Sequence, residues 1–141
     1  MSIQFILLPL FVQVALTFAL LVWTARARTT VIRSGDVKMK DIALGQSNWP
    51  TRPTQIANCY NSQFQIPVLF YVLTILAIAT RHADFLFVVM AWLFVVTRIV
   101  HTYIHTGTNY VPHRFNAFAA GVIVLLLMWA IFAVRLIAGL P

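Results

Sequence analysis

Four long stretches of the chain contain almost no charged side chains, and this pattern restricts the folds that the chain can adopt. An α-helix needs about 20 apolar residues to cross the hydrocarbon core of a bilayer, and each stretch is long enough. Inside lipid, every backbone N–H and C=O group must be hydrogen-bonded within the protein, which favours helices. The sequence therefore predicts an all-α integral membrane four-helix bundle, with spans at about residues 2–25, 54–80, 84–106 and 114–138.

The composition excludes most soluble classes of protein. Hydrophobic residues make up 61% of the chain and charged residues only 9%, as is typical of membrane proteins. The formal net charge of +7 does not indicate a nucleic-acid partner, because the basic residues lie between the apolar stretches and form no recognition stripe. The single cysteine, Cys59, excludes an intrachain disulfide. We expect it to be a small buried side chain, with a reactive thiol as the alternative.

Most of the charge lies between the first two apolar stretches, in a loop at about residues 26–53. This loop carries six basic residues against two acidic ones, so the positive-inside rule places it in the cytoplasm and both termini on the other side. Arg135 argues weakly for the opposite orientation. The first stretch lacks a basic leader and is too long for a signal peptide, so we expect a retained span. Because the later connections are short, residues 1–141 are predicted to form one domain.

Polar side chains gather on one face of the second span and on one face of the third. They are Asn58, Ser62 and Gln65 on the second span, and Arg98, His101 and His105 on the third. The spacings of three, four and seven residues place each set on a single helix face. Gln65 and Arg98 both lie roughly 10–15 Å from the loop side, at 1.5 Å per residue, so the two faces are at matching depth. We therefore predict that the two faces meet, and that Pro67 only kinks the second span.

Arg98 is the strongest single signal in the sequence. An arginine inside a membrane costs roughly 2.5–3.5 kcal/mol, and no acidic residue lies inside a span to neutralise it. Three interpretations remain open. The guanidinium reaches lipid phosphate or caps backbone carbonyls, it belongs to a structural polar network, or it binds an anionic ligand.

The pair His101 and His105 raises the question of a metal or haem. Zinc needs three or four ligands, and neither a glutamate nor a second thiolate is close in sequence, so we expect no metal. Haem held on both faces would need histidines from two helices. Neither histidine has a neighbouring carboxylate, so the catalytic residues, if any, stay unknown. Hydrogen-bonded packing within the bundle is the expected role of both imidazoles.

The segment TGTNYVPHRF connects the third and fourth spans. Its Gly107, Asn109 and Pro112 predict a tight turn, after which His113 and Arg114 begin the fourth helix. Arg114 is therefore expected to face the same pocket as the histidines of the third span. A helix N-terminus beside an arginine suits an anion.

These segments together resemble the MAPEG superfamily, the membrane-associated proteins of eicosanoid and glutathione metabolism. The resemblance covers essentially the whole chain and is strongest to bacterial members of unassigned function. The stretches that carry it are GDVKMKDIAL, WPTRPTQIAN, QFQIPVLFY and RIVHTYIHTGTNYVPHRF. It implies a bacterial inner-membrane protein, a homotrimer of four-helix protomers, and glutathione, where used, bound between protomers in the cytoplasmic half.

The residues that the resemblance places in a glutathione site differ from the family pattern. The Arg-x-x-x-Asn-x-x-Glu pattern of the second helix falls on Asn58, Ser62 and Gln65. The third-helix arginine is kept as Arg98, but the tyrosines at +3 and +7 are His101 and His105. Arg114 corresponds to the arginine that stabilises the glutathione thiolate in some members. Loss of the glutamate charge would weaken glutathione binding by roughly 2–5 kcal/mol.

Three hypotheses about function follow from the sequence and the resemblance. The chain is a glutathione binder or a membrane-bound glutathione transferase-like enzyme acting on a lipophilic electrophile, with Arg98 and Arg114 holding the anion. Alternatively, it is a non-catalytic scaffold or an accessory subunit of a larger membrane complex. In the third hypothesis it binds a quinone or lipid whose head group meets the cations and imidazoles of the third span.

Overall fold

The computed structural model describes residues 2–45 and 48–141, so residues 46 and 47 of the predicted loop lie outside the described part. This part is all-helical. The helices are α1 (Ile3–Arg33), the 3₁₀ turn η1 (Met39–Asp41), α2 (Thr51–Ser62), α3 (Ile66–Ala79), α4 (Phe85–Thr106) and α5 (Val111–Ile137). Four helical segments are long and apolar enough to cross a membrane, with α2 and α3 counting together as one. The predicted all-α fold with four spans is confirmed.

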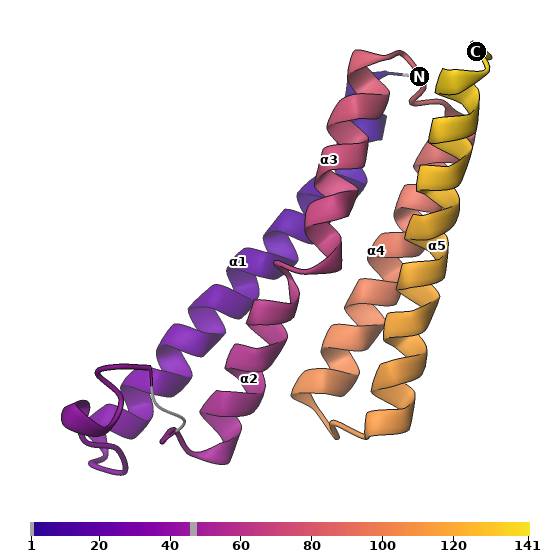
Figure 1. Ribbon diagram of the computed structural model, residues 1–141. Coiled ribbons are helices and arrows are strands. Elements are labelled where there is room, and N and C mark those ends of the chain that lie inside the picture. Colours follow the sequence, from indigo (N-terminus) through magenta and orange to yellow (C-terminus); the bar gives the residue numbers. More distant parts are fainter. Residues whose placement is uncertain (1, 46–47) are drawn as a thin grey trace.

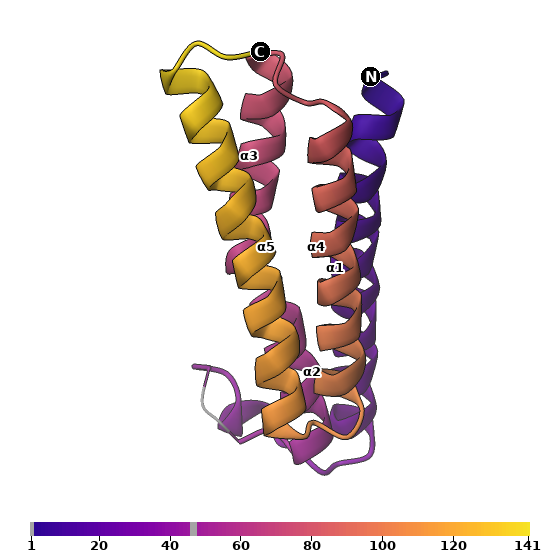
Figure 2. The ribbon, with the colours of Figure 1, turned by 90° about the vertical axis from the view of Figure 1, so that its right-hand side faces the viewer.

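The helices run up and down, so both termini lie at one end of the bundle (Figure 1). We call this end the terminal end. The loop after α1 and the turn between α4 and α5 lie at the opposite end, which we call the loop end. Helices α4 and α5 run side by side in both views (Figure 2), while α1 packs against α2 and α4.

The second span is two helices and not the single kinked helix that the sequence predicted. Helix α2 ends at Ser62 and α3 begins at Ile66, and the backbone of Gln65 is non-helical, with φ −93° and ψ −105°. Pro67 explains the break, because it has no N–H and its ring would clash with the carbonyl of Gln63 in a continuous helix. In the first turn of α3 the proline is well tolerated.

Helix α1 continues well beyond the predicted span at 2–25. Its 31 residues make it roughly 46 Å long, compared with a hydrocarbon thickness of about 30 Å. The last two turns, which carry Arg26, Arg28 and Arg33, therefore project past the apolar layer. The other spans differ less from the prediction. Helix α5 begins three residues earlier than predicted, at Val111, because Pro112 fits the first turn of a helix.

The apolar core lies toward the terminal end. It is centred on Phe70 of α3 and Phe94 of α4, whose ring centroids are 4.9 Å apart. The other fully buried members of this core are Leu73, Ala77, Ala91 and Val95. Most of the buried polar side chains instead lie toward the loop end, and so does the candidate site.

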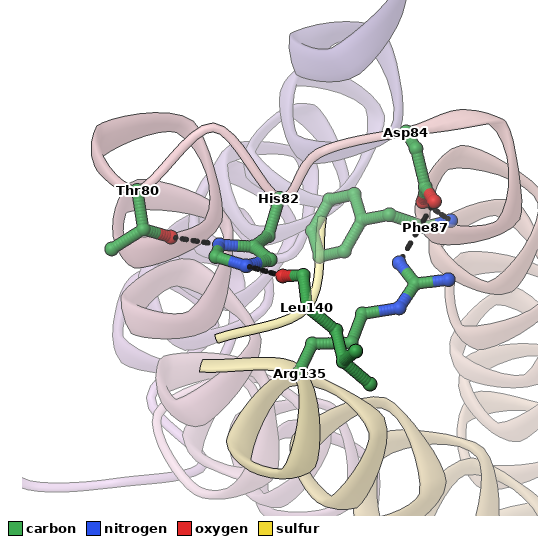
Figure 3. Close-up of polar contacts among 6 residues, drawn as sticks. All are labelled: Thr80, His82, Asp84, Phe87, Arg135 and Leu140. Atoms are coloured by element: carbon green, nitrogen blue, oxygen red, sulfur yellow. Dashed lines mark hydrogen bonds and ion pairs between the residues drawn. The ribbon is translucent and has the colours of Figure 1, made fainter. Parts of the chain in front are cut away.

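A set of polar contacts closes the terminal end (Figure 3). The carboxylate of Asp84 accepts hydrogen bonds from the Phe87 N–H at 3.0 Å and from the Arg135 guanidinium at 2.8 Å. The ring of His82 lies 3.0 Å from the carbonyl of Leu140 and 3.0 Å from the hydroxyl of Thr80. Arg135 lies at the end of the bundle opposite the basic loop, where the positive-inside rule expects few cations. Its ion pair with Asp84 gives it a structural role there.

Candidate functional site

A cavity of about 450 Å³ opens between α2, α4 and α5 near the loop end. We call it the polar pocket. Its lining residues are Asn58, Asn61, Ser62, Gln65, His101, His105, Val111, Arg114, Phe115 and Phe118. The volume lies within the range of about 300–1,000 Å³ that is typical of small-molecule sites. The pocket contains six of the seven site residues that were predicted from the sequence; α2, α4 and α5 contribute five of them, and Gln65 lies in the break before α3.

Arg98 is the seventh predicted residue, and it lies behind the pocket wall. Its side chain is only 2% exposed, which excludes the interpretation in which it reaches lipid phosphate. The guanidinium donates to the hydroxyl of Ser62 at 3.0 Å and, more weakly, to the Ser62 carbonyl at 3.4 Å. The predicted meeting of the two polar faces is confirmed by this contact. Of the three polar residues on the second span, only Ser62 contacts the guanidinium, whereas Asn58 and Gln65 are exposed and line the pocket.

The two histidines form part of the pocket wall on α4. Their rings meet edge to face at 5.3 Å, and His101 also lies 6.0 Å from the ring of Phe118 on α5. Both side chains are buried, at 4% and 8% exposure, yet neither Nδ1 atom has a hydrogen-bond partner among the described residues. The expected hydrogen-bonded packing is therefore wrong, and the two rings instead pack against each other, with Phe118 beside His101. A buried nitrogen without a hydrogen-bond partner costs a protein roughly 1–3 kcal/mol of folding free energy.

Arg114 provides the positive charge of the pocket. Its guanidinium donates to the side-chain oxygen of Asn109 at 2.8 Å, which holds it beside the turn between α4 and α5. Asn109 adopts a left-handed conformation with φ 53°, which asparagine tolerates better than most residues. No acidic residue is among the lining residues that the structure describes. The pocket is therefore suited to an anion.

Contacts between α2 and the end of α4 hold the mouth of the pocket in place. The side-chain amide of Gln55 donates to the carbonyls of His105 at 2.7 Å and Gly107 at 3.0 Å. Arg52 donates to the carbonyl of Thr106. These carbonyls belong to the last turn of a helix, where the backbone has no internal partner, so the two side chains act as a cap.

The sequence analysis missed a buried network behind the pocket. Gln13 of α1 is fully buried, and its amide donates to the side-chain oxygen of Gln63 at 2.8 Å. The amide of Gln63 in turn donates to the Ser62 hydroxyl at 3.1 Å and to the Cys59 carbonyl at 3.0 Å. The network thus connects α1, α2 and Arg98 on α4. A glutamine near the middle of a mostly apolar span was the signal that could have revealed it.

A second cavity adjoins the polar pocket on the side of the terminal end. It has a volume of about 440 Å³ and an apolar lining, and we call it the apolar groove. Its lining residues are Ile66, Leu69, Val122, Leu125, Leu126 and Trp129. At the helix break, Gln65 lines the polar pocket and the next residue, Ile66, lines the apolar groove. The indole nitrogen of Trp129 is buried without a partner among the described residues.

Comparison with known proteins supports the resemblance that the motifs indicated. The sequence model of the MAPEG family matches residues 6–134, a stretch that includes every residue lining the two cavities. No curated protein and no solved structure matches the chain. Since the match extends over nearly the whole length and all four spans, the chain belongs to the MAPEG family.

Proposed function

We propose that this membrane protein binds a small anionic molecule in the polar pocket, with glutathione as the first candidate. The observation that carries the proposal is a pocket lined by one arginine, Arg114, and the two imidazole rings of α4, with no acid among its described lining residues. The family membership, the size of the cavity and its position near the loop end support the same function.

Each part of the pocket has a role in this proposal. The guanidinium of Arg114 pairs with a carboxylate or stabilises a thiolate by a charge-assisted hydrogen bond. The amides of Asn58 and Gln65 bind the peptide groups of the ligand. Arg98 is a positioning residue, because it acts on the pocket through Ser62. Gln65 offers no charge to an ammonium group, so binding is expected to be weak, near the millimolar range.

The apolar groove provides a place for a lipophilic electrophile next to the thiol. Conjugation would form a bond between the thiolate sulfur and the electrophilic carbon, and the leaving group would depart with the bonding electrons. Arg114 would stabilise the thiolate before the attack. The protein would then be a membrane-bound glutathione transferase-like enzyme. The basic loop favours a cytoplasmic loop end, and the family favours a homotrimer in the bacterial inner membrane.

Thermal unfolding of the detergent-purified protein with millimolar glutathione tests the proposal. At ten times its dissociation constant, a ligand stabilises a protein by roughly 1.4 kcal/mol, so 10 mM glutathione should give a visible shift even with weak binding. We expect it in the parent and in Arg81→Gln, which removes an exposed arginine at the terminal end, but not in Arg114→Gln. The absence of a shift in the parent up to 10 mM glutathione would contradict glutathione as the ligand.

The second candidate function is a non-catalytic scaffold or accessory subunit of a larger membrane complex. It is favoured by three differences from the pattern of glutathione-using members. Asn58 and Gln65 are neutral where that pattern has arginine and glutamate, and Ser62 replaces an asparagine. It predicts no small ligand and a stoichiometric partner in the purified protein. The third, a quinone or lipid binder, is favoured by the apolar groove and by the imidazole rings that line the polar pocket. It predicts organic-extractable material in the preparation.

A further inference from the structure

The wall of the polar pocket supplies neutral amides and positive charge, and this limits the chemistry of the ligand. Three exposed amide side chains line it, those of Asn58, Asn61 and Gln65. Asn58 and Asn61 share a face near the end of α2, because they are three residues apart, and Gln65 follows in the break before α3. Arg114 of α5 is half-buried and adds a cation. Among its described residues, the wall contains no anion.

The hydroxyl of Ser62 lies in the same wall, but its hydrogen-bonding capacity is already used. A serine hydroxyl has one proton to donate and two lone pairs to accept with. The proton is donated to the carbonyl of Cys59 at 2.6 Å, and the oxygen accepts from Arg98 at 3.0 Å and from Gln63 at 3.1 Å. Ser62 therefore leaves the ligand to the three amides, and it holds a second cation, Arg98, directly behind the wall.

The chain has few acidic residues that could complement these cations. The sequence contains three, which are Asp36, Asp41 and Asp84. Asp84 lies at the terminal end, in its ion pair with Arg135. Asp36 and Asp41 belong to the loop after α1, where basic residues outnumber acidic ones by six to two. A second copy of the chain that reached the pocket with this loop would therefore add net positive charge.

Such a wall binds a carboxylate and an ammonium group very differently. A carboxylate accepts hydrogen bonds from the amide N–H groups and pairs with Arg114. An ammonium group is solvated by the amide oxygens, but no described residue of the wall neutralises it, and both arginines repel it. We propose that the preferred ligand is a thiol with amide groups and carboxylates but without an ammonium group, as in a des-amino or N-acylated counterpart of glutathione. This inference rests on the proposed function and concerns the same site.

Glutathione and glutaryl-cysteinylglycine test this inference, because the two thiols differ only in the α-ammonium group. Thermal unfolding of the detergent-purified protein over a range of ligand concentrations gives a dissociation constant for each. We expect the parent to bind the des-amino ligand about tenfold more tightly than glutathione. Unfolding without ligand verifies that each variant below is folded.

A carboxylate introduced into the wall should reverse this preference. We expect Gln65→Glu to bind glutathione about tenfold more tightly than the parent does, and the des-amino ligand less tightly. Gln4→Glu makes the same change at an exposed position near the start of α1 and should leave both dissociation constants unchanged. Arg114→Gln should weaken both ligands, because both carry carboxylates.

This inference and the proposed function fail in different ways. A shift with the des-amino ligand alone would support the inference and replace glutathione as the first candidate. Equal binding of the two thiols by the parent, or tighter binding of glutathione, would overturn the inference and leave the proposed function in place. No shift with either thiol would contradict both. A preference that persists unchanged in Gln65→Glu, Asn58→Asp and Asn61→Asp would overturn the missing acid as its cause.

Discussion

Arg98 on α4 and Ser62 on α2 are joined by a hydrogen bond of 3.0 Å that crosses between two spans and closes the back of the polar pocket. The arginine in the third apolar stretch is thus a link between helices, and Ser62, the residue that it contacts, separates it from the pocket. Its Nε atom has no partner among the described residues, so the guanidinium is incompletely satisfied. The value of this contact for stability can be measured.

We predict that Arg98→Met is close to neutral for stability, whereas Arg98→Ala is destabilising by about 2–4 kcal/mol. Methionine fills much of the volume of the arginine stem and removes a buried cation that has no counter-ion. Alanine leaves a cavity in its place. Chemical or thermal unfolding in detergent compares the two. Equal losses for both variants would mean that the guanidinium itself holds the helices together.

The pair Gln13 and Gln63 is predicted to be energetically coupled across α1 and the α2–α3 break. Gln13→Leu leaves the side-chain oxygen of Gln63 buried without its donor, and we expect a loss of about 1–3 kcal/mol. A double-mutant cycle with Gln63→Leu should show that the second change costs less once the first is present. Strictly additive losses in unfolding experiments would exclude the coupling.

Gly121 is predicted to be required for the close approach of α5 to α4. A Cβ atom at this position would lie 2.9 Å from the hydroxyl oxygen of Thr97 and 3.8 Å from the ring of Phe94. We expect Gly121→Ala to destabilise the protein by about 1–3 kcal/mol, more than the helix propensity of alanine recovers. Adding Thr97→Ala should restore most of the loss. A double variant no more stable than Gly121→Ala would contradict this cause.

Stability at low pH is predicted to depend on Asp84. Partial burial raises the pKa of Asp84, but the Phe87 N–H and the Arg135 guanidinium lower it more, so the net pKa is below its usual value. A carboxylate with a lowered folded-state pKa stabilises the fold above its unfolded pKa of about 3.9, and this contribution is lost as the pH falls through the folded value. Thermal unfolding between pH 7 and pH 2 should show this loss.

Two variants separate the charge of Asp84 from its helix cap. Asp84→Asn keeps a capping side chain and should cost only about 0.2–1 kcal/mol at pH 7, because the ion pair with Arg135 is partly exposed. Its melting temperature should vary less with acid than that of the parent. Asp84→Ala also removes the bond to the Phe87 N–H and should cost a further 0.5–2 kcal/mol, roughly. An unchanged acid profile in Asp84→Asn would assign the pH dependence to another group.

Helical periodicity accounts for the parts of the site that were predicted well. The faces of α2 and α4 follow from fixed spacings, so Asn58, Ser62, Gln65, His101 and His105 were expected together, and they line one pocket. The break at Gln65 was missed, because a proline inside an apolar stretch is compatible with a kink or with a new helix start. A new helix start leaves backbone carbonyls and side chains at the break without partners inside the helix. It forms where they find partners elsewhere, and Gln63 does so by bonding to Gln13, Ser62 and the Cys59 carbonyl.

Contacts between distant parts of the chain were beyond the reach of the sequence. Gln13 and Gln63 are 50 positions apart, and Asp84 and Arg135 are 51 apart. Neither pair has a local pattern that would indicate its partner. The unpartnered histidine nitrogens were likewise unexpected, because their surroundings depend on the α5 face that carries Phe118.

The sequence by itself determined the four membrane spans, the position of the basic loop and the polar face of each helix, because uncharged length and helical period are local properties of the chain. The tertiary structure alone decided that Arg98 is buried behind Ser62, that Gln13 of α1 contacts Gln63, and that an apolar groove lies beside the polar pocket. These outcomes depend on which helix faces meet and at what height. The packing of the whole bundle determines that choice, since each buried polar group must find its partner on another helix.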